Sequence, residues 1–324
     1  MDIVCLGELL IDLFPAEIGR RLVEVSAFHP KPGGAPGNVA VAARRLGLAS
    51  AFIGKVGDDA FGRFLIDTLA AEGVETRAIR LDDEARTTLA FIALPDPHHA
   101  EFVFYRNPGA DTRLRPDELD GELLRHARAL HVGSLSLVAE PSRAATFQAV
   151  EIARAAGALV SFDVNYRPSL WPTPDAAVAA IRDLLPLAHV VKVNEDELCL
   201  LTGTADADAG GAALLAAGPA LVVVTLGARG SAYCSADAAG FVPAFPVDTV
   251  DAIGCGDAFM AGVLAGLLGN ADGGAWSQRL DDDHLRPILR YANAVGALTA
   301  TRAGALPALP TAAEVDEFLR VTSG

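Results

Sequence analysis

Residues 129–164, ALHVGSLSLVAEPSRAATFQAVEIARAAGALVSFDV, contain two short apolar runs separated by a longer segment with a helical pattern. The runs Ala129–Val132 and Leu159–Val164 are apolar almost throughout, which is typical of strands that are buried on both faces. Ser142–Ala156 between them is rich in Ala and indicates a helix. A strand, a helix and a second strand in this order predict a βαβ unit with parallel strands.

The same alternation continues along most of the chain. It predicts an α/β fold with a central, mostly parallel sheet and helices on both faces. The other expected strands are Ile3–Leu6, Ala51–Gly54, Val190–Val193 and Leu221–Thr225, and the other expected helices are Val39–Leu46, Phe61–Ala71 and Ala176–Leu185. No linker is long enough to separate independent domains, so we expect one domain over 1–324.

Two segments interrupt this rhythm. Leu13–Phe28 and Thr87–Tyr105 alternate between apolar and polar residues, as half-exposed antiparallel strands do. Pro95–His99 has the composition of an exposed hairpin turn. We therefore predict a small separate sheet that forms a lid over a site at the carboxyl ends of the main strands.

Composition excludes several classes of protein. The formal net charge of −15 argues against nucleic-acid binding, which needs clustered Lys and Arg. The N-terminus has no basic region before an apolar run, and the most apolar long window, Ala209–Leu226, is interrupted by Gly and Pro, so we expect neither a signal peptide nor a membrane span. Cys5 and Cys199 lie in apolar stretches and indicate buried free thiols in a reducing cytoplasm.

The strongest local signal is Asp251–Phe259, DAIGCGDAF, a glycine-rich turn that runs into an apolar helical stretch. Such a turn presents backbone N–H groups at a helix N-terminus, where they bind anions such as phosphate. A carboxylate at Asp257 would repel a bound phosphate, so we interpret it as a base that accepts the proton of an attacking hydroxyl. The alternative is that Asp257 only caps the helix, and the local pattern leaves both interpretations open.

Asp251–Phe259 resembles the C-terminal signature, D-[TS]-x-G-A-G-D-x-F, of the ribokinase-like (PfkB-type) sugar kinases. Gly33–Ala40, GGAPGNVA, resembles the N-terminal sugar-binding segment of that family, and Gly54–Gly62, GKVGDDAFG, resembles its second glycine-rich motif. Because the three motifs occur in the order that the family has, together they are far more specific than any one of them. The resemblance implies a ribokinase-like fold and ATP-dependent phosphorylation of a sugar hydroxyl.

By this resemblance Asp257 is the catalytic base, and the backbone N–H groups of Gly254, Cys255 and Gly256 form the hole for the transferring phosphoryl group. Ala252 and Cys255 replace the usual Thr or Ser and the usual Ala, and neither change removes a backbone donor. A thiol at a helix N-terminus is expected to have a lowered pKa, although the neighbouring carboxylates act in the opposite direction. We expected Cys255 to react with alkylating agents faster than Cys5 or Cys199.

The resemblance also implies a set of substrate-binding residues: Asp12, Gly33, Gly34, Asn38, Arg106 and Arg167. The amide of Asn38 can reach a sugar hydroxyl, and Arg106 would reach the sugar from the lid. Other interpretations stay open, since Asn38 could only cap the following helix, Asp12 could be a turn residue and Arg167 an exposed loop cation.

Nucleotide-binding residues are implied in the same way: Asn165, Asn194, Glu197, Thr225, Gly227, Gly230 and Asn293. Asn194–Glu197 would equally suit a helix cap with an acidic first turn. Mg²⁺ would enter with ATP. A potassium ion is implied behind the anion-hole loop, held by Asp251 and by carbonyl groups of Asp251–Ile253, including Ile253, and of Ala300–Ala308.

Longer phrases suggest the substrate. Phe104–Asp111, Gly133–Leu137 and Leu170–Pro172 resemble segments of fructokinases, so we expect D-fructose to be converted to fructose 6-phosphate. Ribose, 2-keto-3-deoxygluconate and 5-dehydro-2-deoxygluconate are alternative substrates, and a non-catalytic sugar-binding protein on the same fold is an alternative function. A nicotinamide oxidoreductase is not supported, because no G-x-G-x-x-G follows the first strand. We also expect a homodimer formed through the lid sheet.

Overall fold

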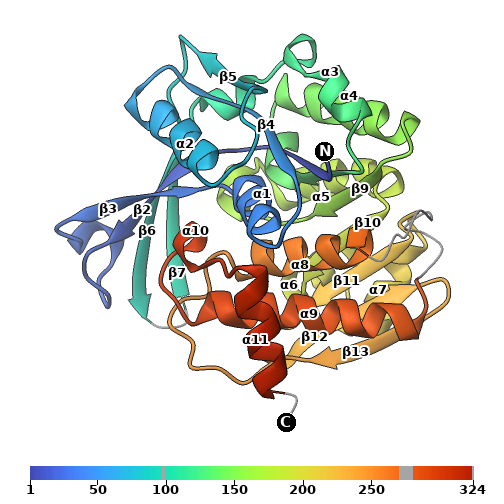
Figure 1. Cartoon of the computed structure of the whole chain (residues 1–324). Helices are drawn as coiled ribbons and strands as arrows, with labels where there is room; N and C mark the ends of the chain where they lie inside the picture. The colour runs from blue at the N-terminus through green and yellow to red at the C-terminus, as the bar shows by residue number, and fades with distance from the viewer. Residues whose placement is uncertain (97–98, 270–279, 323–324) are drawn as a thin grey trace.

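The computed structural model of the chain describes residues 1–96, 99–269 and 280–322 (Figure 1). Its main sheet has nine strands in the order β13-β12-β11-β10-β9-β8-β1-β4-β5. The strands are β1 Ile3–Leu6, β4 Ser50–Gly57, β5 Ile79–Asp82, β8 Ala129–Gly133, β9 Leu159–Asp163, β10 Val190–Asn194, β11 Leu221–Thr225, β12 Gly230–Ser235 and β13 Ala239–Pro243. The βαβ unit expected at 129–164 is present as two neighbouring parallel strands, β8 and β9.

All strand pairs from β5 to β11 are parallel, and only β12 and β13 join antiparallel. The expected central, mostly parallel sheet is therefore confirmed. The sequence pattern missed β5, β12 and β13. β5 is the short IRLD, and β12 is rich in small and polar residues, so none of these strands has the apolar run that reveals a buried parallel strand.

Helices cover both faces of this sheet, as expected. They are α1 Ala35–Arg45, α2 Ala60–Ala71, α3 Gly121–Arg125, α4 Ser142–Ala155, α5 Pro174–Leu184, α6 Glu195–Thr202, α7 Ala207–Leu215, α8 Cys255–Gly269, α9 Asp282–Ala300, α10 Ala305–Ala308 and α11 Ala312–Thr322. Alternate residues of β1 enter opposite cores: Cys5 packs with α1, α8 and α9, whereas Val4 packs with α4 and α5. No helix within the described ranges is long and apolar enough to cross a membrane.

A second sheet of four strands has the order β3-β2-β6-β7 and projects to one side of the main body (Figure 1). Its strands are β2 Leu10–Pro15, β3 Phe28–Gly33, β6 Leu89–Asp96 and β7 His99–Tyr105. The small sheet is confirmed, but its first two strands lie at the ends of the expected 13–28 segment and beyond. β3 contains two prolines, which the pattern read as irregular although an edge strand tolerates them. The tip of the expected hairpin turn, residues 97–98, lies outside the described residues.

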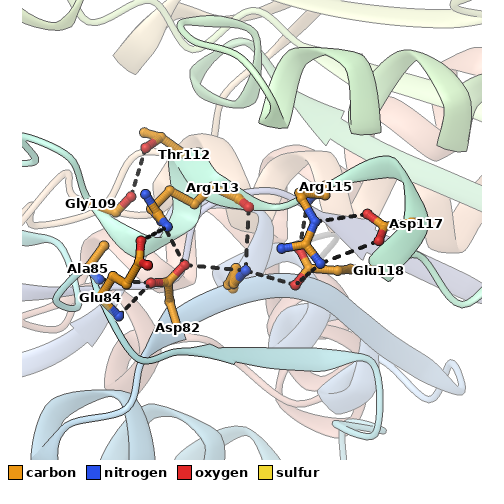
Figure 2. Close-up of polar contacts among 10 residues, drawn as sticks. Asp82, Glu84, Ala85, Gly109, Thr112, Arg113, Arg115, Asp117 and Glu118 are labelled. Carbon is orange, nitrogen blue, oxygen red and sulfur yellow. Dashed lines mark hydrogen bonds and ion pairs between the residues drawn. The ribbon is translucent and has the colours of Figure 1, made fainter.

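The segment 110–118, which follows the β6–β7 hairpin, is tied to the main sheet by charged groups (Figure 2). We call Lys55, Asp82, Arg113 and Glu118 the lid-base cluster. Lys55 Nζ lies 3.3 Å from Asp82 Oδ2 and 2.8 Å from Glu118 Oε1, and Arg113 Nε donates to Asp82 Oδ2 at 2.9 Å. Arg113 comes shortly after β7, so the cluster fixes the point at which the chain returns from the lid.

The other end of the hairpin is held by Asp59, which belongs to the second glycine-rich motif. Asp59 caps α2 through the N–H group of Gly62 and accepts hydrogen bonds from Thr87 N at 2.9 Å and Thr87 Oγ1 at 2.8 Å. Thr87 lies just before β6. The motif at 54–62 therefore contributes Lys55 and Asp59 to the attachment of the lid.

One expectation about cysteines is wrong. Cys5 is buried, but Cys199 is exposed. Leu198 and Leu201 are the residues that α6 turns into the core, and three residues of spacing place them on one side of the helix. Cys199 follows Leu198 directly and so points away from the core.

Candidate active site

The candidate site lies between the lid sheet and the carboxyl ends of the main strands. Asp12 comes from β2 of the lid, Asn38 from α1, and Asp257 from the first turn of α8. Asn38 Nδ2 donates a hydrogen bond to Asp257 Oδ2 at 2.8 Å, which joins two positions 219 residues apart in the chain. The structure thus brings together the residues expected at the sugar and at the transferring phosphoryl group.

Asp257 is the third residue of α8, a helix of 15 residues that begins at Cys255. It is therefore not the N-cap of this helix, and its carboxylate faces the Asn38 amide. Burial raises the pKa of Asp257 to about 6, and the nearby Asp163 adds to this effect, while the Asn38 hydrogen bond, Lys192 and Arg167 oppose it. A carboxyl group with this pKa can exchange a proton near neutral pH.

Asn38 lies in the first turn of α1 and does not cap it. The helix begins at Ala35, with Gly34 at the N-cap and Pro36 in the first positions, where proline is favoured. The sequence pattern placed the start at Val39, with Asn38 as its cap. Asn38 is 4% exposed, and its Oδ1 atom has no hydrogen-bond partner among the described residues.

Asp12 is buried at 8% exposure and faces the same space. Burial raises its pKa to about 7, and the charges of Asp257 and Asp251 act in the same direction, whereas Arg167 and Lys31 lower it. A Cβ atom added at Gly33 would lie 2.0 Å from Asp12 Oδ2. Only glycine at position 33 therefore allows the backbone of β3 to lie this close to the Asp12 carboxylate. Asp12 is therefore part of the site and not a free turn residue.

The loop before α8 has the geometry of an anion hole. Gly254 adopts φ +82°, and its carbonyl group accepts the first helical hydrogen bond, from Ala258 N at 2.9 Å. The N–H groups of Gly256 and Asp257 then belong to the first turn, where a helix has no partner for them, whereas Cys255 N donates to the carbonyl oxygen of Ala252 at 3.3 Å. A bound phosphoryl group could accept hydrogen bonds there.

The Cys255 thiol does not behave as expected. Burial raises the pKa of Cys255 to about 12, and the charges of Asp251 and Asp257 contribute to the rise. Its Sγ atom lies 3.8 Å from the carbonyl oxygen of Asp251, to which it donates. The pKa is therefore shifted opposite to the lowering expected at a helix N-terminus, because desolvation and like charge exceed that effect, and this direction argues against a reactive thiol.

Asp251 joins the two loops that were expected to hold a potassium ion. Its Oδ1 accepts from Ile253 N at 2.9 Å and its Oδ2 from Gly304 N at 2.8 Å. Val250 N also donates to the carbonyl of Ala300 at 2.8 Å. The two loops are therefore adjacent, and Asp251 holds them together through backbone N–H groups.

The expected nucleotide residues lie further along the same edge of the sheet. Asn194 and Thr225 are directly opposite each other at the ends of β10 and β11, and Gly227 and Gly230 follow in the next turn. Asn165 adopts φ +37° after β9, with its N–H group bonded to Asp163 Oδ1. The ends of β9, β10 and β11 thus gather these five positions at the edge where ligands bind in open α/β sheets.

Two of these residues use their side chains elsewhere. Glu197 accepts from Asn194 N and from Tyr166 N, both at 2.8 Å, and forms a capping box with Asn194. Asn293 Nδ2, on α9, donates to the carbonyls of Val242 and Pro243 at 3.1 and 3.2 Å. The capping interpretation of Asn194–Glu197 is therefore confirmed.

The two arginines expected at the site differ in their contacts. Arg167 lies with its guanidinium 6.0 Å from the Phe102 ring of the lid and acts on the pKa of both Asp12 and Asp257. Arg106 is buried, and its Nε donates to Asp111 Oδ2 at 2.8 Å. It also lines a cavity of about 560 Å³ between β7 and the segments 138–139 and 169–170.

Comparisons with known proteins agree with this geometry. Residues 1–312 match the family described as pfkB family carbohydrate kinase. The chain is 45% identical over 320 residues to the probable fructokinase-2 of Arabidopsis thaliana, covering 98% of this chain and 96% of that protein. The chain belongs to the pfkB family of carbohydrate kinases.

Solved structures of the family have the same fold. The fructokinase of Xylella fastidiosa with bound ATP superimposes with a TM-score of 0.90 at 38% identity, over 100% of this kinase and 99% of that chain. A double mutant of the Vibrio cholerae O395 fructokinase, solved with fructose, ADP and a potassium ion, gives 0.87 at 35% identity over 98% of both chains. The ribokinase-like fold is therefore confirmed.

The sequence pattern missed a buried ion pair of this kinase. Lys192 Nζ lies 3.0 Å from both oxygens of Asp163, and a Cβ atom built on Gly256 would come within 2.9 Å of the same Nζ. A buried cation therefore lies directly beside the anion-hole loop. The signal was present, since Lys192 is the one charged residue in the apolar strand β10, VVKVN.

Proposed function

We propose that this carbohydrate kinase transfers the γ-phosphoryl group of ATP to the 6-hydroxyl of D-fructose, with Asp257 as the base. The supporting observation is the half-buried Asp257 carboxylate, which is hydrogen-bonded to Asn38 at 2.8 Å and lies in the first turn of α8. A carboxylate held beside free helix N–H groups suits a hydroxyl that loses its proton while it attacks a phosphoryl group.

The proposed step is an in-line displacement. The sugar oxygen forms a bond to the γ-phosphorus, the bond from that phosphorus to the bridging oxygen of ADP breaks, and the hydroxyl proton passes to Asp257. The N–H groups of Gly254 and Gly256 would stabilise the phosphoryl oxygens, joined by that of Cys255 when it leaves the Ala252 carbonyl, and the nearby Lys192 adds positive charge behind them. Asn38 keeps the Asp257 carboxylate turned toward the sugar.

The sugar is expected to rest against Gly33 and Gly34, between Asn38 on one side and Asp12 on the other. Arg167 opposes the two carboxylates Asp12 and Asp257, both of which have a raised pKa in its presence. The nucleotide would follow the edge formed by Asn194, Thr225 and Gly227. These roles rest on the matching motifs together with the proximity of the residues.

Magnesium would accompany ATP. No group of three or more His, Cys, Asp or Glu side chains that could hold a metal occurs in the described part of the chain. We expect the cation to be held mainly by phosphate oxygens and water, where it would neutralise charge on the transferring group.

We also propose that potassium activates the enzyme by ordering the loop 254–256. The adjacent loops around Asp251 and Ala300 supply carboxylate and carbonyl oxygens, which suit a monovalent cation. Turnover measured in sodium and potassium buffers of matched ionic strength tests this, and equal rates would contradict it.

A coupled assay for ADP tests the substrate. We expect D-fructose to give the highest kcat/KM among fructose, ribose, glucose and 2-keto-3-deoxygluconate. The relatives named above as fructokinases and the fructokinase-like segments at 104–111 and 133–137 support this choice. A clear preference for ribose or for the keto acid would contradict the proposed sugar and leave the kinase family unchanged.

We propose that the chain works as one cytoplasmic catalytic domain and forms a homodimer through the outer face of its lid. Tyr105 is 65% and Val103 41% exposed on that face, and Phe91 packs against Phe28 and Tyr105 at ring distances of 5.1 and 5.2 Å. Exposed aromatic residues of this kind favour association. Light scattering of the wild type and of Tyr105→Asp tests it, and a monomeric wild type would contradict it.

A further inference from the structure

Glu8 is a buried carboxylate that the proposed reaction does not use. It follows β1 directly and is 3% exposed. Its Oε1 atom accepts a hydrogen bond from Ala35 N at 3.1 Å, at the start of α1. Its Oε2 atom is buried and has no hydrogen-bond partner in the described part of the chain. An unsatisfied carboxylate oxygen in the interior is costly and calls for an explanation.

Glu8 lies close to the sugar-binding turn. A Cβ atom built on Gly34 would be 2.5 Å from the carbonyl oxygen of Glu8. Ala35, which bonds the Glu8 side chain, is three residues before Asn38 on α1, so both lie on one side of the helix. Asn38 in turn bonds Asp257. Glu8 is therefore about one helical turn from the catalytic end of the pocket.

Two further buried atoms lack partners nearby. They are Asn38 Oδ1 and Arg106 Nη1, in side chains that are 4% and 7% exposed. Arg106 and Glu8 act on each other's pKa, so their charges are close. No ion pair within 4.0 Å joins them, although both residues lie in the described ranges. A gap therefore separates a free acceptor from a free donor.

The chemistry of these three atoms matches hydroxyl groups. Glu8 Oε2 and Asn38 Oδ1 need donors, whereas Arg106 Nη1 needs an acceptor. One hydroxyl can donate to Glu8 Oε2 and accept from Arg106 Nη1 at the same time. A second hydroxyl can donate to Asn38 Oδ1. A carboxylate group of a substrate has no proton to donate, and it would lie against the charge of Glu8.

We propose that Glu8 is a specificity-determining residue of the sugar pocket: with Arg106 it binds a hydroxyl at the end of a neutral polyol remote from the phosphorylated one, and it rejects sugar acids. This inference rests on the proposed sugar kinase function and adds a substrate class to it. A site that hydrogen-bonds a substrate hydroxyl discriminates strongly against analogues that lack it.

The charges around Glu8 agree with this assignment. Arg106 is the cation that lowers the pKa of Glu8, and it is already paired with Asp111. A carboxylate on the ligand would have to share this guanidinium with two carboxylates, which favours an uncharged ligand. Burial also raises the pKa of Glu8 to about 7, as expected for a carboxylate with one unpaired oxygen.

The test compares Glu8→Gln with a matched control, Glu72→Gln. Gln keeps an oxygen for Ala35 N but replaces the free acceptor with a donor. For Glu8→Gln we expect KM for fructose to rise about 10- to 100-fold with little change in kcat, as for loss of a hydrogen bond to a charged group. The ratio of kcat/KM for 2-keto-3-deoxygluconate to that for fructose should rise at least about tenfold. Glu72 pairs with Arg45 at the other end of α1, and its variant should leave both values unchanged.

Deoxy analogues keep the inference testable if Glu8→Gln does not fold. The wild-type enzyme should lose about 10-fold or more in kcat/KM with 1-deoxyfructose or with 2,5-anhydromannitol, which lack a hydroxyl at C1 or C2. For the Glu8→Gln variant, kcat/KM with the same analogue should be close to kcat/KM with fructose, because the contact is already absent. If neither analogue is disfavoured by the wild type, the inference is wrong.

Other outcomes separate the two proposals. A wild type that prefers the sugar acid contradicts both the proposed substrate and the role of Glu8. A wild type that prefers fructose, with a Glu8→Gln variant of lowered Tm but unchanged KM and unchanged substrate ratio, contradicts only the role of Glu8. In that case the carboxylate serves the start of α1, and a buried water satisfies its second oxygen.

Discussion

The lid-base cluster and the active site both bury several carboxylates, but they treat the charges in opposite ways. In the lid-base cluster, burial would raise the pKa of Asp82, yet the N–H groups of Ala85 and Glu84 together with Arg113 and Lys55 lower it far below the usual range (Figure 2). In the active site, the pKa values of Asp257 and Asp12 are raised to about 6 and about 7. Carboxyl groups that lie away from bulk water therefore have pKa values shifted in opposite directions at the two places.

The difference lies in the number of partners. Asp82 receives two backbone N–H groups and two cations, so each of its oxygens is satisfied. Asp257 receives one side-chain amide, and Asn38 Oδ1 and Glu8 Oε2 receive no donor at all in the described part of the structure. Fully paired charges hold the lid to the sheet. In the active site, oxygens without donors remain available to a ligand, and they lower the stability of the ligand-free protein.

The largest expected effect comes from removing the active-site charge. Asp257→Asn should lower kcat by roughly 10²–10⁴ with little change in the KM for sugar, because the base acts only in the transition state. The same change should raise Tm near pH 8, since a carboxylate with a raised pKa is less stable in the folded protein than in the unfolded chain. Steady-state kinetics and calorimetry measure both. A well-folded variant with normal turnover would remove Asp257 from the mechanism.

The opposite result is expected in the lid-base cluster. Lys55→Met should lower the free energy of unfolding by about 3 kcal/mol, because it leaves Asp82 and Glu118 buried with one cation fewer. Arg320→Met is the control: Arg320 pairs with Glu317 at the surface, with side chains 71% and 59% exposed, and should cost less than about 1 kcal/mol. Urea titrations compare the two variants. Equal losses would show that burial does not distinguish these ion pairs.

The features that the sequence could predict are those with a local signal. The buried strands β1, β8, β9, β10 and β11 were visible as apolar runs, and the anion-hole loop as Gly254–Gly256 before an apolar helix. These are local signals. The start of α1 at Ala35 was missed because the same residues, APGN, suit a turn, and only the packed helix shows that Pro36 initiates it.

Contacts between distant segments could not be predicted. Lys55 and Glu118 are 63 residues apart, and Asn38 and Asp257 are 219 apart. Local spacing contains no information on such pairs, so the matching motifs alone suggested that Asn38 and Asp257 share a site. Glu8 was passed over for the same reason: a carboxylate after a strand is common in turns, and its unpaired oxygen is a property of the packed structure.

A pH profile sharpens the comparison further. The base must be deprotonated, so kcat/KM should rise with pH and level off above about 6, with roughly a tenfold fall per pH unit below that value. This pKa depends on the charges around Asp257, which are those of Asp163, Lys192 and Arg167, and on the Asn38 hydrogen bond. The charge of Asp257 in turn raises the pKa of Asp12. The fall of kcat/KM at low pH therefore reports both carboxyl groups together.

The stability profile should run the other way. Both carboxyl groups have a folded pKa above the ordinary value near 4, so their contribution to stability is present below about pH 4 and is lost as the pH rises through 6 to 7. Asp257→Asn should flatten part of this loss. If kcat/KM instead begins to fall only near pH 4, the Asp257 carboxylate is more exposed to solvent than the structure shows.

The smallest effects are expected at the cysteines, which differ between the surface and the site. Cys199 is exposed on α6, whereas the pKa of Cys255 is raised to about 12 by burial and then by Asp251 and Asp257. Because the thiolate is the reactive form, iodoacetamide should label Cys199 first, Cys234 more slowly, and Cys255 and Cys5 last. Turnover should stay nearly constant while Cys199 is labelled, and Cys255→Ala should keep nearly all of its activity, since the anion hole uses backbone N–H groups. Peptide mapping at partial labelling gives the order. If Cys255 is labelled before Cys199, the effect of the helix N-terminus on the thiol exceeds that of desolvation. The loop 254–256 would then also be more open than the contact of Cys255 Sγ with the Asp251 carbonyl implies.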